Sequence, residues 1–243
     1  MKLFHVSDLH FGQEDREALD WFAGEVAQEK PDAVICTGDL TMRGTGREFA
    51  AAREWLKGLA VPMLVEPGNH DMPYYYNPIG RLLWPYRHYD ALRAELSSEL
   101  TFPDVEIVSL RTITRFQFRI DQSKGHISGD RLEAALARVS LHIAKPLCLV
   151  ACHHPLIEAD THSKASTRGG KRALAALARA GADAVLSGHV HDAFDKTVEL
   201  DGNAIRMIGA GTLSERVRTT APSYNQLGWT RETGLLVTNR VHG

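Results

Sequence analysis

The first part of the chain alternates between short strand-like segments and segments whose apolar residues recur every three or four positions. The strand-like segments are residues 2–6, 33–36 and 61–65. The helix-like segments carry Leu19, Phe22, Ala23 and Val26 in one case and Phe49, Ala52, Leu56 and Leu59 in the other. Strand, helix and strand in this order predict parallel strand pairs joined by right-handed crossovers, as in an α/β fold.

Further strands and helices are predicted along the rest of the chain. The strands are at residues 105–110, 116–120, 146–152 and 184–186, and the helices at residues 128–139 and 173–180. Towards the C-terminus, residues 196–200 and 204–208 predict a β-hairpin, and residues 224–230 and 235–241 a further antiparallel pair. Since no repeat or linker interrupts the sequence, we expect one domain over residues 1–243.

Aromatic residues are concentrated in residues 73–100, where the pattern predicts a loop followed by a helix. Five of the six tyrosines lie here, together with Trp84: Tyr74, Tyr75, Tyr76, Tyr86 and Tyr89. Two interpretations of the segment stay open. It forms either a wall that stacks on a base or covers an acyl chain, or an aromatic core beneath a capping helix.

Composition narrows the class of protein. The 243 residues are 44% hydrophobic and 24% charged, as in ordinary globular proteins. A formal net charge of -2 gives no strong signal for nucleic-acid binding. No apolar run approaches the roughly 18 residues of a membrane span, and the N-terminus becomes polar at Ser7 and Asp8, too early for a signal peptide. We therefore expect a cytoplasmic protein, with Cys36, Cys148 and Cys152 as buried, reduced thiols.

Residues that commonly bind metals follow five of the predicted strands. The segments are Asp8-Leu9-His10, Gly38-Asp39, Gly68-Asn69-His70-Asp71, His153-His154-Pro155 and Gly188-His189-Val190-His191. Turn formation explains a glycine, an asparagine or an aspartate at such a place, but it does not explain the histidines. Because ligands of open α/β sheets bind at the carboxyl ends of the strands, these five segments are expected to converge.

The number and type of these residues indicate two metal ions. Two aspartates, one asparagine and four histidines are too many ligands for one tetrahedral site, and His70 is left over. They suit two ions about 3.5–4 Å apart that share a carboxylate. Imidazole mixed with oxygen ligands favours Mn, Fe, Co, Ni or Zn over Ca or an all-oxygen Mg site. Such a pair lowers the pKa of a bridging water and binds a phosphoryl oxygen, which implies hydrolysis of a phosphate ester or anhydride.

The five segments, in this order over residues 8–191, resemble the motifs of the calcineurin-like metallophosphoesterases. Three further segments are similar to those of small bacterial class III cyclic-nucleotide and glycerophosphodiester phosphodiesterases: Thr41-Met42-Arg43-Gly44, Ser123-Lys124-Gly125 and Ala210-Gly211-Thr212. The resemblance implies a four-layer αββα sandwich, an α/β fold with two mixed β-sheets and a dinuclear centre at their edge.

The resemblance also implies a role for each site residue. Asp8, His10 and His191 hold the first ion, Asn69, His153 and His189 hold the second, and Asp39 bridges them. His70 is the outer catalytic residue, which protonates the leaving oxygen or stabilises its charge. Asp71 either accepts the other ring proton of His70 or has a turn or helix-capping role. Since neighbouring strand residues point to opposite sides, His154 is expected to have a structural role or to support the ligands rather than to be the ligand itself.

The expected function is hydrolysis of a small-molecule phosphodiester, a cyclic nucleotide being one candidate, by a hydroxide that bridges the metals. Alternatives are a pyrophosphatase or phosphomonoesterase, including the UDP-diacylglucosamine hydrolase type, or a nuclease. A non-catalytic scaffold is a further alternative, although the chain keeps all seven ligand positions and His70. Arg43 either contacts the substrate phosphate or is solvated.

Overall fold

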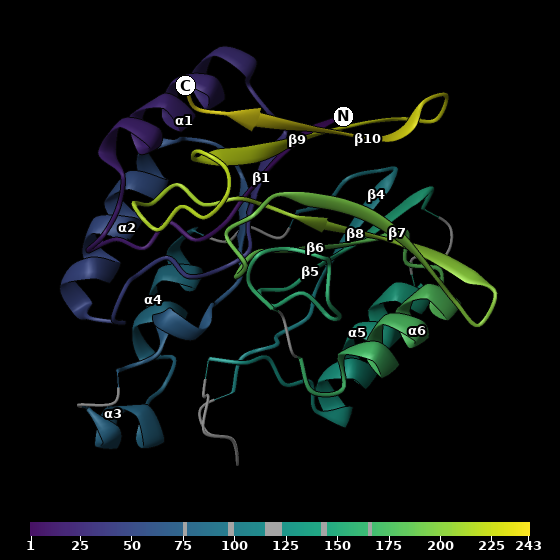
Figure 1. The fold of residues 1–243 in the computed structure, drawn as a ribbon, viewed down its shortest axis with the longest axis horizontal. Coiled ribbons are helices and arrows are strands. Elements are labelled where there is room, and N and C mark those ends of the chain that lie inside the picture. Colours follow the sequence, from purple (N-terminus) through teal and green to yellow (C-terminus); the bar gives the residue numbers. More distant parts are fainter. Residues whose placement is uncertain (75–76, 97–99, 115–122, 142–144, 165–166) are drawn as a thin grey trace.

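Two mixed β-sheets, each with five strands, form the centre of the protein (Figure 1). The computed structural model describes residues 1–74, 77–96, 100–114, 123–141, 145–164 and 167–243. The strands of the first sheet are, in order, β10 (Gly234–Val241), β9 (Ser223–Thr230), β1 (Lys2–Val6), β2 (Ala33–Cys36) and β3 (Met63–Val65). The strands of the second sheet are β4 (Val105–Ser109), β5 (Leu147–Ala151), β6 (Ala184–Ser187), β8 (Asn203–Gly209) and β7 (Phe194–Leu200).

Helices cover the outer face of each sheet. On the first sheet lie α1 (Arg16–Glu29), α2 (Gly46–Gly58) and α4 (Arg87–Leu96), whose buried residues share a core with β1, β2 and β3. On the second lie α5 (Gly129–Leu141) and α6 (Gly170–Ala180), which share another core with β4, β5 and β6. Figure 1 shows these two groups of helices on opposite sides of the strands. The predicted four-layer αββα sandwich is confirmed.

A third core lies between the two sheets and explains why the central strands are apolar on both faces. In β2, Ile35 faces this inner core, whereas Val34 and Cys36 face the helices. In β5, Leu149 faces the inner core and Val150 faces the helices. Neighbouring residues of a strand point to opposite faces, so a strand with helices on one side and a sheet on the other needs apolar residues throughout.

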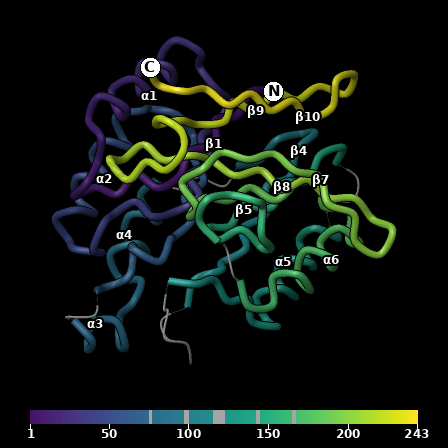
Figure 2. The backbone as a smooth tube through the Cα atoms, viewed as in Figure 1, coloured from purple at the N-terminus to yellow at the C-terminus, as the bar shows by residue number. Residues whose placement is uncertain are grey.

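The strand directions determine where the chain can place functional residues. β1, β2 and β3 are parallel, as are β4, β5, β6 and β8. The candidate ligands follow the carboxyl ends of β1, β2, β3, β5 and β6. β9 and β10 complete the first sheet in antiparallel fashion, so the C-terminal part of the chain returns to β1 (Figure 2). The hairpin of β7 and β8 and the pair of β9 and β10 are both confirmed.

Residues 73–100 form two helices rather than the single predicted one. The short helix α3 (Pro78–Leu83) precedes α4 and buries none of its residues. Tyr89 of α4 is buried, and its hydroxyl donates a hydrogen bond to the Val65 carbonyl at 2.8 Å. The core interpretation therefore holds for Tyr89. The predicted strand at residues 116–120, together with Tyr75 and Tyr76, lies outside the described residues.

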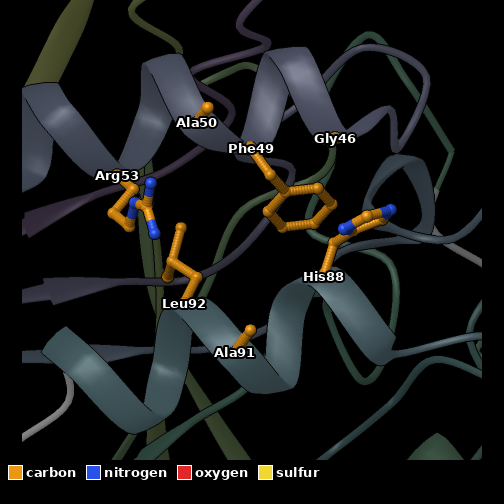
Figure 3. A pocket seen from close by; sticks show the side chains of 7 residues that line it. All are labelled: Gly46, Phe49, Ala50, Arg53, His88, Ala91 and Leu92. Carbon is orange, nitrogen blue, oxygen red and sulfur yellow. The ribbon is translucent and has the colours of Figure 1, made fainter.

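A small cavity of about 110 Å³ lies between α2 and α4 (Figure 3). The imidazole of His88 stacks on the ring of Phe49, with centroids 5.8 Å apart. The residues that line the cavity are Gly46, Phe49, Ala50, Arg53, His88, Ala91 and Leu92. None of these is a candidate metal ligand, so the cavity belongs to the packing of the helices.

Two further expectations about the chain can be compared with the structure. Cys36, Cys148 and Cys152 are free and buried, as predicted. Burial raises the pKa of the Cys36 and Cys148 thiols to about 12, which keeps them protonated and unreactive at neutral pH. Within the described ranges, no helix combines the length and the hydropathy needed to cross a bilayer.

Candidate metal centre

The ligand segments are held side by side by backbone hydrogen bonds that extend beyond the ends of the strands. The amide of Asp8 donates to the Gly38 carbonyl at 2.9 Å, and that of His10 donates to the Asp39 carbonyl at 3.0 Å. In the second sheet, the Gly188 amide donates to the His153 carbonyl at 2.9 Å. The predicted convergence of the segments is therefore a direct consequence of parallel strand pairing.

The Asp8 carboxylate takes part in a hydrogen bond between the two sheets at this edge. The amide of His189, which follows β6 of the second sheet, donates to Asp8 Oδ2 at 2.8 Å. Asp8 follows β1 of the first sheet, so its carboxylate helps to hold the two halves of the sandwich together. The other oxygen, Oδ1, is buried and has no hydrogen-bond partner among the described residues. A buried polar atom without a hydrogen-bond partner is unusual in a folded protein. A metal ion bound to this oxygen and to the two neighbouring imidazoles would explain it.

The first candidate group consists of Asp8, His10 and His191. Asp8 Oδ1 lies 3.1 Å from His191 Nε2 and 3.6 Å from His10 Nε2. The two Nε2 atoms lie 3.2 Å apart. All three side chains are buried. Three donor atoms therefore face one small volume, and they are a carboxylate and two imidazoles, a set that suits a transition metal.

The second candidate group consists of Asn69, His153 and His189. Asn69 Oδ1 lies 3.2 Å from His153 Nε2, and the His153 and His189 rings have centroids 5.2 Å apart. Asp39 lies between the two groups: its Oδ2 is 3.8 Å from His10 Nε2 and 3.4 Å from His153 Nε2. The structure thus brings together all seven residues that the sequence predicted as ligands.

Backbone carbonyls hold two of the candidate ligand imidazoles in one orientation. Nδ1 of His153 donates to the Thr37 carbonyl at 2.8 Å, and Nδ1 of His191 donates to the Arg216 carbonyl at 2.7 Å. With Nδ1 as the donor, the neutral ring presents the lone pair of Nε2 to the centre. This is the arrangement in which histidine ligates a metal through Nε2.

The backbone of the ligand segments is strained. Five of the candidate ligands have a left-handed φ: Asp8 (56°), His10 (47°), Asp39 (51°), His189 (71°) and His191 (61°). Such conformations cost roughly 1–3 kcal/mol each in residues other than glycine and persist where the surrounding structure imposes them. Backbone strain of this kind concentrates at functional sites, and here it turns the side chains away from the strand direction and into the centre.

Two glycines allow the segments to approach so closely. A Cβ atom on Gly68 would collide with the Asp39 carboxylate, and one on Gly188 would collide with Ser7 and with the Asp8 carboxylate. Both glycines were part of the sequence motifs, and the structure shows that each is required by the carboxylate beside it.

The charges of the centre depend strongly on one another. Burial raises the pKa of Asp39, but the neighbouring imidazoles of His153 and His70 outweigh it, so the pKa lies well below its usual range. Burial lowers the pKa of His153, but Asp39 outweighs this effect and raises the pKa to about 9. Burial dominates for His189 and lowers its pKa to about 3. The metal-free centre therefore holds ionised carboxylates, which attract cations.

The structure corrects one expectation, the pairing of Asp71 with His70. Nδ1 of His70 donates to the Met42 carbonyl at 2.7 Å, so Met42 orients the ring. The Asp71 carboxylate instead accepts hydrogen bonds from the amides of Leu40, Thr41 and Gly68 at 2.8–3.2 Å. Asp71 therefore joins the two turns that carry Asp39 and Asn69, in agreement with the alternative turn role.

His154 has the structural role that was expected. Its Nε2 donates to the Ser123 carbonyl at 2.7 Å, and its Nδ1 accepts from the Thr112 hydroxyl at 2.9 Å. The ring nitrogens of His154 approach those of His153 and His189, but both nitrogens of His154 form hydrogen bonds with other residues of the protein. The neutral ring has one donor and one acceptor, so no lone pair remains for a metal.

Arg216 is part of the centre but belongs to none of the motifs that the sequence revealed. Its Nη1 lies 3.3 Å from His70 Nε2 and 3.4 Å from His10 Nε2. The only sequence signal in its neighbourhood was Ala210-Gly211-Thr212, which lies in the same loop between β8 and β9.

Comparisons with known proteins agree with this geometry. A family model described as Calcineurin-like phosphoesterase matches residues 1–193. A probable cyclic nucleotide phosphodiesterase of Synechococcus sp. is 25% identical over 206 residues, which cover 80% of this chain and 74% of that protein. The glycerophosphodiester phosphodiesterase of Enterobacter lignolyticus is 37% identical over 82 residues, so the match spans 29% of this chain and 30% of that protein.

A solved structure shows the same fold. The crystal structure of a dimetal phosphatase from Danio rerio has a TM-score of 0.72 at 14% identity, with 98% of each chain covered. The protein described here belongs to the calcineurin-like phosphoesterase family, as the sequence motifs indicated. Two-metal chemistry is typical of that family, and the described residues contain four overlapping sets of candidate ligands.

Proposed function

We propose that the protein is a metal-dependent phosphodiesterase of small molecules that uses two metal ions. The observation that carries this proposal is the position of Asp39, whose Oδ2 lies between His10 of one ligand group and His153 of the other. A carboxylate shared by two sets of imidazole and oxygen ligands is the arrangement that holds a pair of ions.

The donor set fits such ions. Asp8, His10 and His191 would hold the first, Asn69, His153 and His189 the second, and Asp39 both. The unpartnered Asp8 Oδ1 and the orientation of His153 and His191, whose Nδ1 atoms are held by backbone carbonyls so that Nε2 faces the centre, support this assignment. When bound, the ions supply an activated water and polarise the phosphoryl group. Mn, Fe, Co, Ni and Zn all suit the mixed nitrogen and oxygen ligands.

His70 is placed to act on the leaving group. Its backbone amide donates to Asp39 Oδ1 at 2.8 Å, and its ring is fixed through Nδ1 to Met42. Nε2 therefore faces the side of the centre on which Arg216 lies. In this position Nε2 protonates the leaving oxygen or stabilises its charge, a contribution of typically 10²–10⁴-fold for general acid catalysis.

A cavity beside the catalytic turns supports a diester substrate. It has a volume of about 250 Å³, and its walls include Arg43, Tyr74, Asn77 and His88. Residues 43–46 follow the Asp39 turn, and residues 73–77 follow the His70 turn. We assign this cavity to the alcohol part of the ester. The relatives named as cyclic nucleotide and glycerophosphodiester phosphodiesterases support the same substrate class.

The test is the hydrolysis of bis-p-nitrophenyl phosphate compared with p-nitrophenyl phosphate after chelation and reloading with Mn. We expect metal-dependent turnover that favours the diester, and no turnover by Asp39→Ala prepared in the same way. Preference for the monoester would favour a phosphatase. Failure to cleave either compound with two ions bound would contradict a general phosphodiesterase and favour narrow pyrophosphatase specificity or a scaffold.

A further inference from the structure

Arg216 lies in a loop, residues 210–222, that is fixed to the centre at several points. The Thr212 hydroxyl donates to the Asp8 carbonyl at 2.6 Å, and the Thr219 hydroxyl donates to Asp192 Oδ1 at 2.6 Å. Between them, the Arg216 carbonyl accepts the hydrogen bond from His191 Nδ1. Asp8 and His191 are both candidate ligands, so the loop that carries Arg216 is positioned by the same residues that form the metal centre.

The guanidinium group of Arg216 reaches the open side of the centre. The contacts of the guanidinium group with other described side chains all involve Nη1. Its partners are His70 Nε2, His10 Nε2 and, at 3.7 Å, Met42 Sδ. When Nδ1 of His70 donates to Met42 and the ring is neutral, Nε2 accepts from Arg216. In the protonated ring, which acts as the acid, Nε2–H faces the leaving oxygen instead of accepting from Arg216. Nε and Nη2 of Arg216 have no partner among the described residues, and their N–H groups remain available to a ligand.

Arg216 has no carboxylate partner for its guanidinium group among the described residues. Seven arginines form ion pairs with acidic side chains: Arg16, Arg53, Arg138, Arg179, Arg206, Arg231 and Arg240. The ion pairs within the described ranges include none with Arg216, although its side chain is half-buried. The direct contacts of this half-buried guanidinium group are two imidazoles and a thioether, so an anion bound beside it would satisfy its remaining N–H groups.

We propose that Arg216 binds a phosphate oxygen of the substrate on the His70 side of the centre. This inference rests on the proposed function and adds a residue that the motifs do not contain. A guanidinium group offers several N–H donors in a planar fork that matches two phosphate oxygens. Arg216 thereby places the phosphoryl group against His70, the residue that acts on the leaving oxygen.

The short distance to His10 has a second consequence. His10 Nε2 is a candidate ligand atom and lies 3.4 Å from Arg216 Nη1. A cation held by His10 is therefore repelled by Arg216 until an anion screens the two positive charges. Phosphate and metal should then strengthen each other's binding, and the coupling should pass through Arg216. Coupling between two ligands is reciprocal and typically amounts to about 5- to 150-fold in affinity.

The experiment measures the binding of inorganic phosphate to the Mn-loaded protein by calorimetry, and of Mn with and without phosphate. The variants are Arg216→Gln, which removes the charge, and Arg216→Lys, which keeps the charge but loses the fork. Arg218→Gln is the matched control, because Arg218 is an exposed residue of the same loop. Metal content and thermal stability are recorded for each variant.

We expect Arg216→Gln to bind two Mn ions but to lose roughly 10- to 100-fold in phosphate affinity, as for a hydrogen bond to a charged group. Arg216→Lys should fall between Arg216→Gln and the wild type, and Arg218→Gln should match the wild type. Phosphate should raise the Mn affinity of the wild type clearly more than that of Arg216→Gln.

The proposal is overturned if Arg216→Gln binds phosphate as tightly as the wild type, if the wild type binds no phosphate, or if Arg216→Gln loses its metals. These outcomes are distinct from a failure of the proposed function. Suppose that the wild type cleaves no diester, but the Arg216→Gln substitution still lowers the phosphate affinity. Phosphate binding by Arg216 would then be supported, and the proposed phosphodiesterase reaction would be wrong.

Discussion

The two halves of the metal centre are built from similar residues but differ in burial and charge. Asp8, His10 and His191 are at most 3% exposed. In the second half His153 is also buried, but Asn69 and His189 are half-buried. The first half has a carboxylate of its own, and the second has a neutral amide in the corresponding place. We therefore expect the first group to retain an ion more tightly than the second.

Both halves also depend on both sheets. Asp8 and His10 follow β1 of the first sheet, while His191 follows β6 of the second. Asn69 follows β3 of the first sheet, while His153 and His189 follow β5 and β6 of the second. Neither half exists until the inner core between the sheets has formed, so the difference between the halves arises from local burial and ligand type alone.

The largest effect is expected from Asp39→Ala, which removes the carboxylate that joins the halves. We expect loss of both ions and a fall in turnover of at least about 10³-fold, because two-metal stabilisation supplies several kcal/mol. Metal analysis after dialysis and diester hydrolysis measure the two effects. Retention of both ions would show that Asp39 does not bridge the halves.

His70→Ala tests whether a residue outside both ligand groups carries catalysis. We expect both ions to stay bound and turnover to fall by about 10²–10⁴-fold, since a general acid is lost. The loss should be greater for an alkyl ester than for a p-nitrophenyl ester, because a poor leaving group needs the proton more. The comparison of both esters in one variant is the measurement, and loss of metal instead would reassign His70 as a ligand.

Asp8→Asn and Asn69→Ala test the inequality of the halves directly. Each variant should lose one ion, but Mn titration should show that Asp8→Asn loses the tighter site and Asn69→Ala the weaker one. The physical reason is the additional buried carboxylate in the first half, since each carboxylate brings a full charge to the ion. Equal affinities of the two sites in the wild type would contradict this comparison.

A smaller effect is expected from pH. The pKa of His153 in the metal-free chain is raised to about 9, because Asp39 outweighs the effect of burial. His153 is therefore protonated at pH 7 and must lose its proton to ligate. Binding of a metal to the second half should therefore release one proton from His153. As a result, the metal affinity of this half should fall about tenfold for each pH unit below about 9. Calorimetry in buffers of different ionisation enthalpy measures the release, and a pH-independent affinity would exclude it.

The described strands and the convergence of the candidate ligands could be predicted from the sequence because both are encoded locally. Ala33–Cys36 was predicted with its correct bounds, since four buried residues are followed at once by polar ones. Asp39 follows this strand at a fixed short distance, and parallel pairing then determines where it lies. Convergence of the ligands needed no information about the loops.

Arg216 and the partner of His70 could not be predicted in this way. Arg216 depends on the path of a long loop, which is fixed by contacts with Asp8, His191 and Asp192 far away in the sequence. The choice of Met42 over Asp71 as the partner of His70 depends on how the turn after Asp39 folds back over the ring. Both outcomes are decided by tertiary packing, for which no local pattern exists.

The most direct test of the account is a crystal structure of the Mn-loaded protein with anomalous diffraction measured at the Mn edge. We predict two peaks about 3.5–4 Å apart. One should contact Asp8, His10 and His191, the other Asn69, His153 and His189, and both should contact Asp39. A single peak, or two peaks that do not share Asp39, would contradict the two-metal centre on which the proposed function rests.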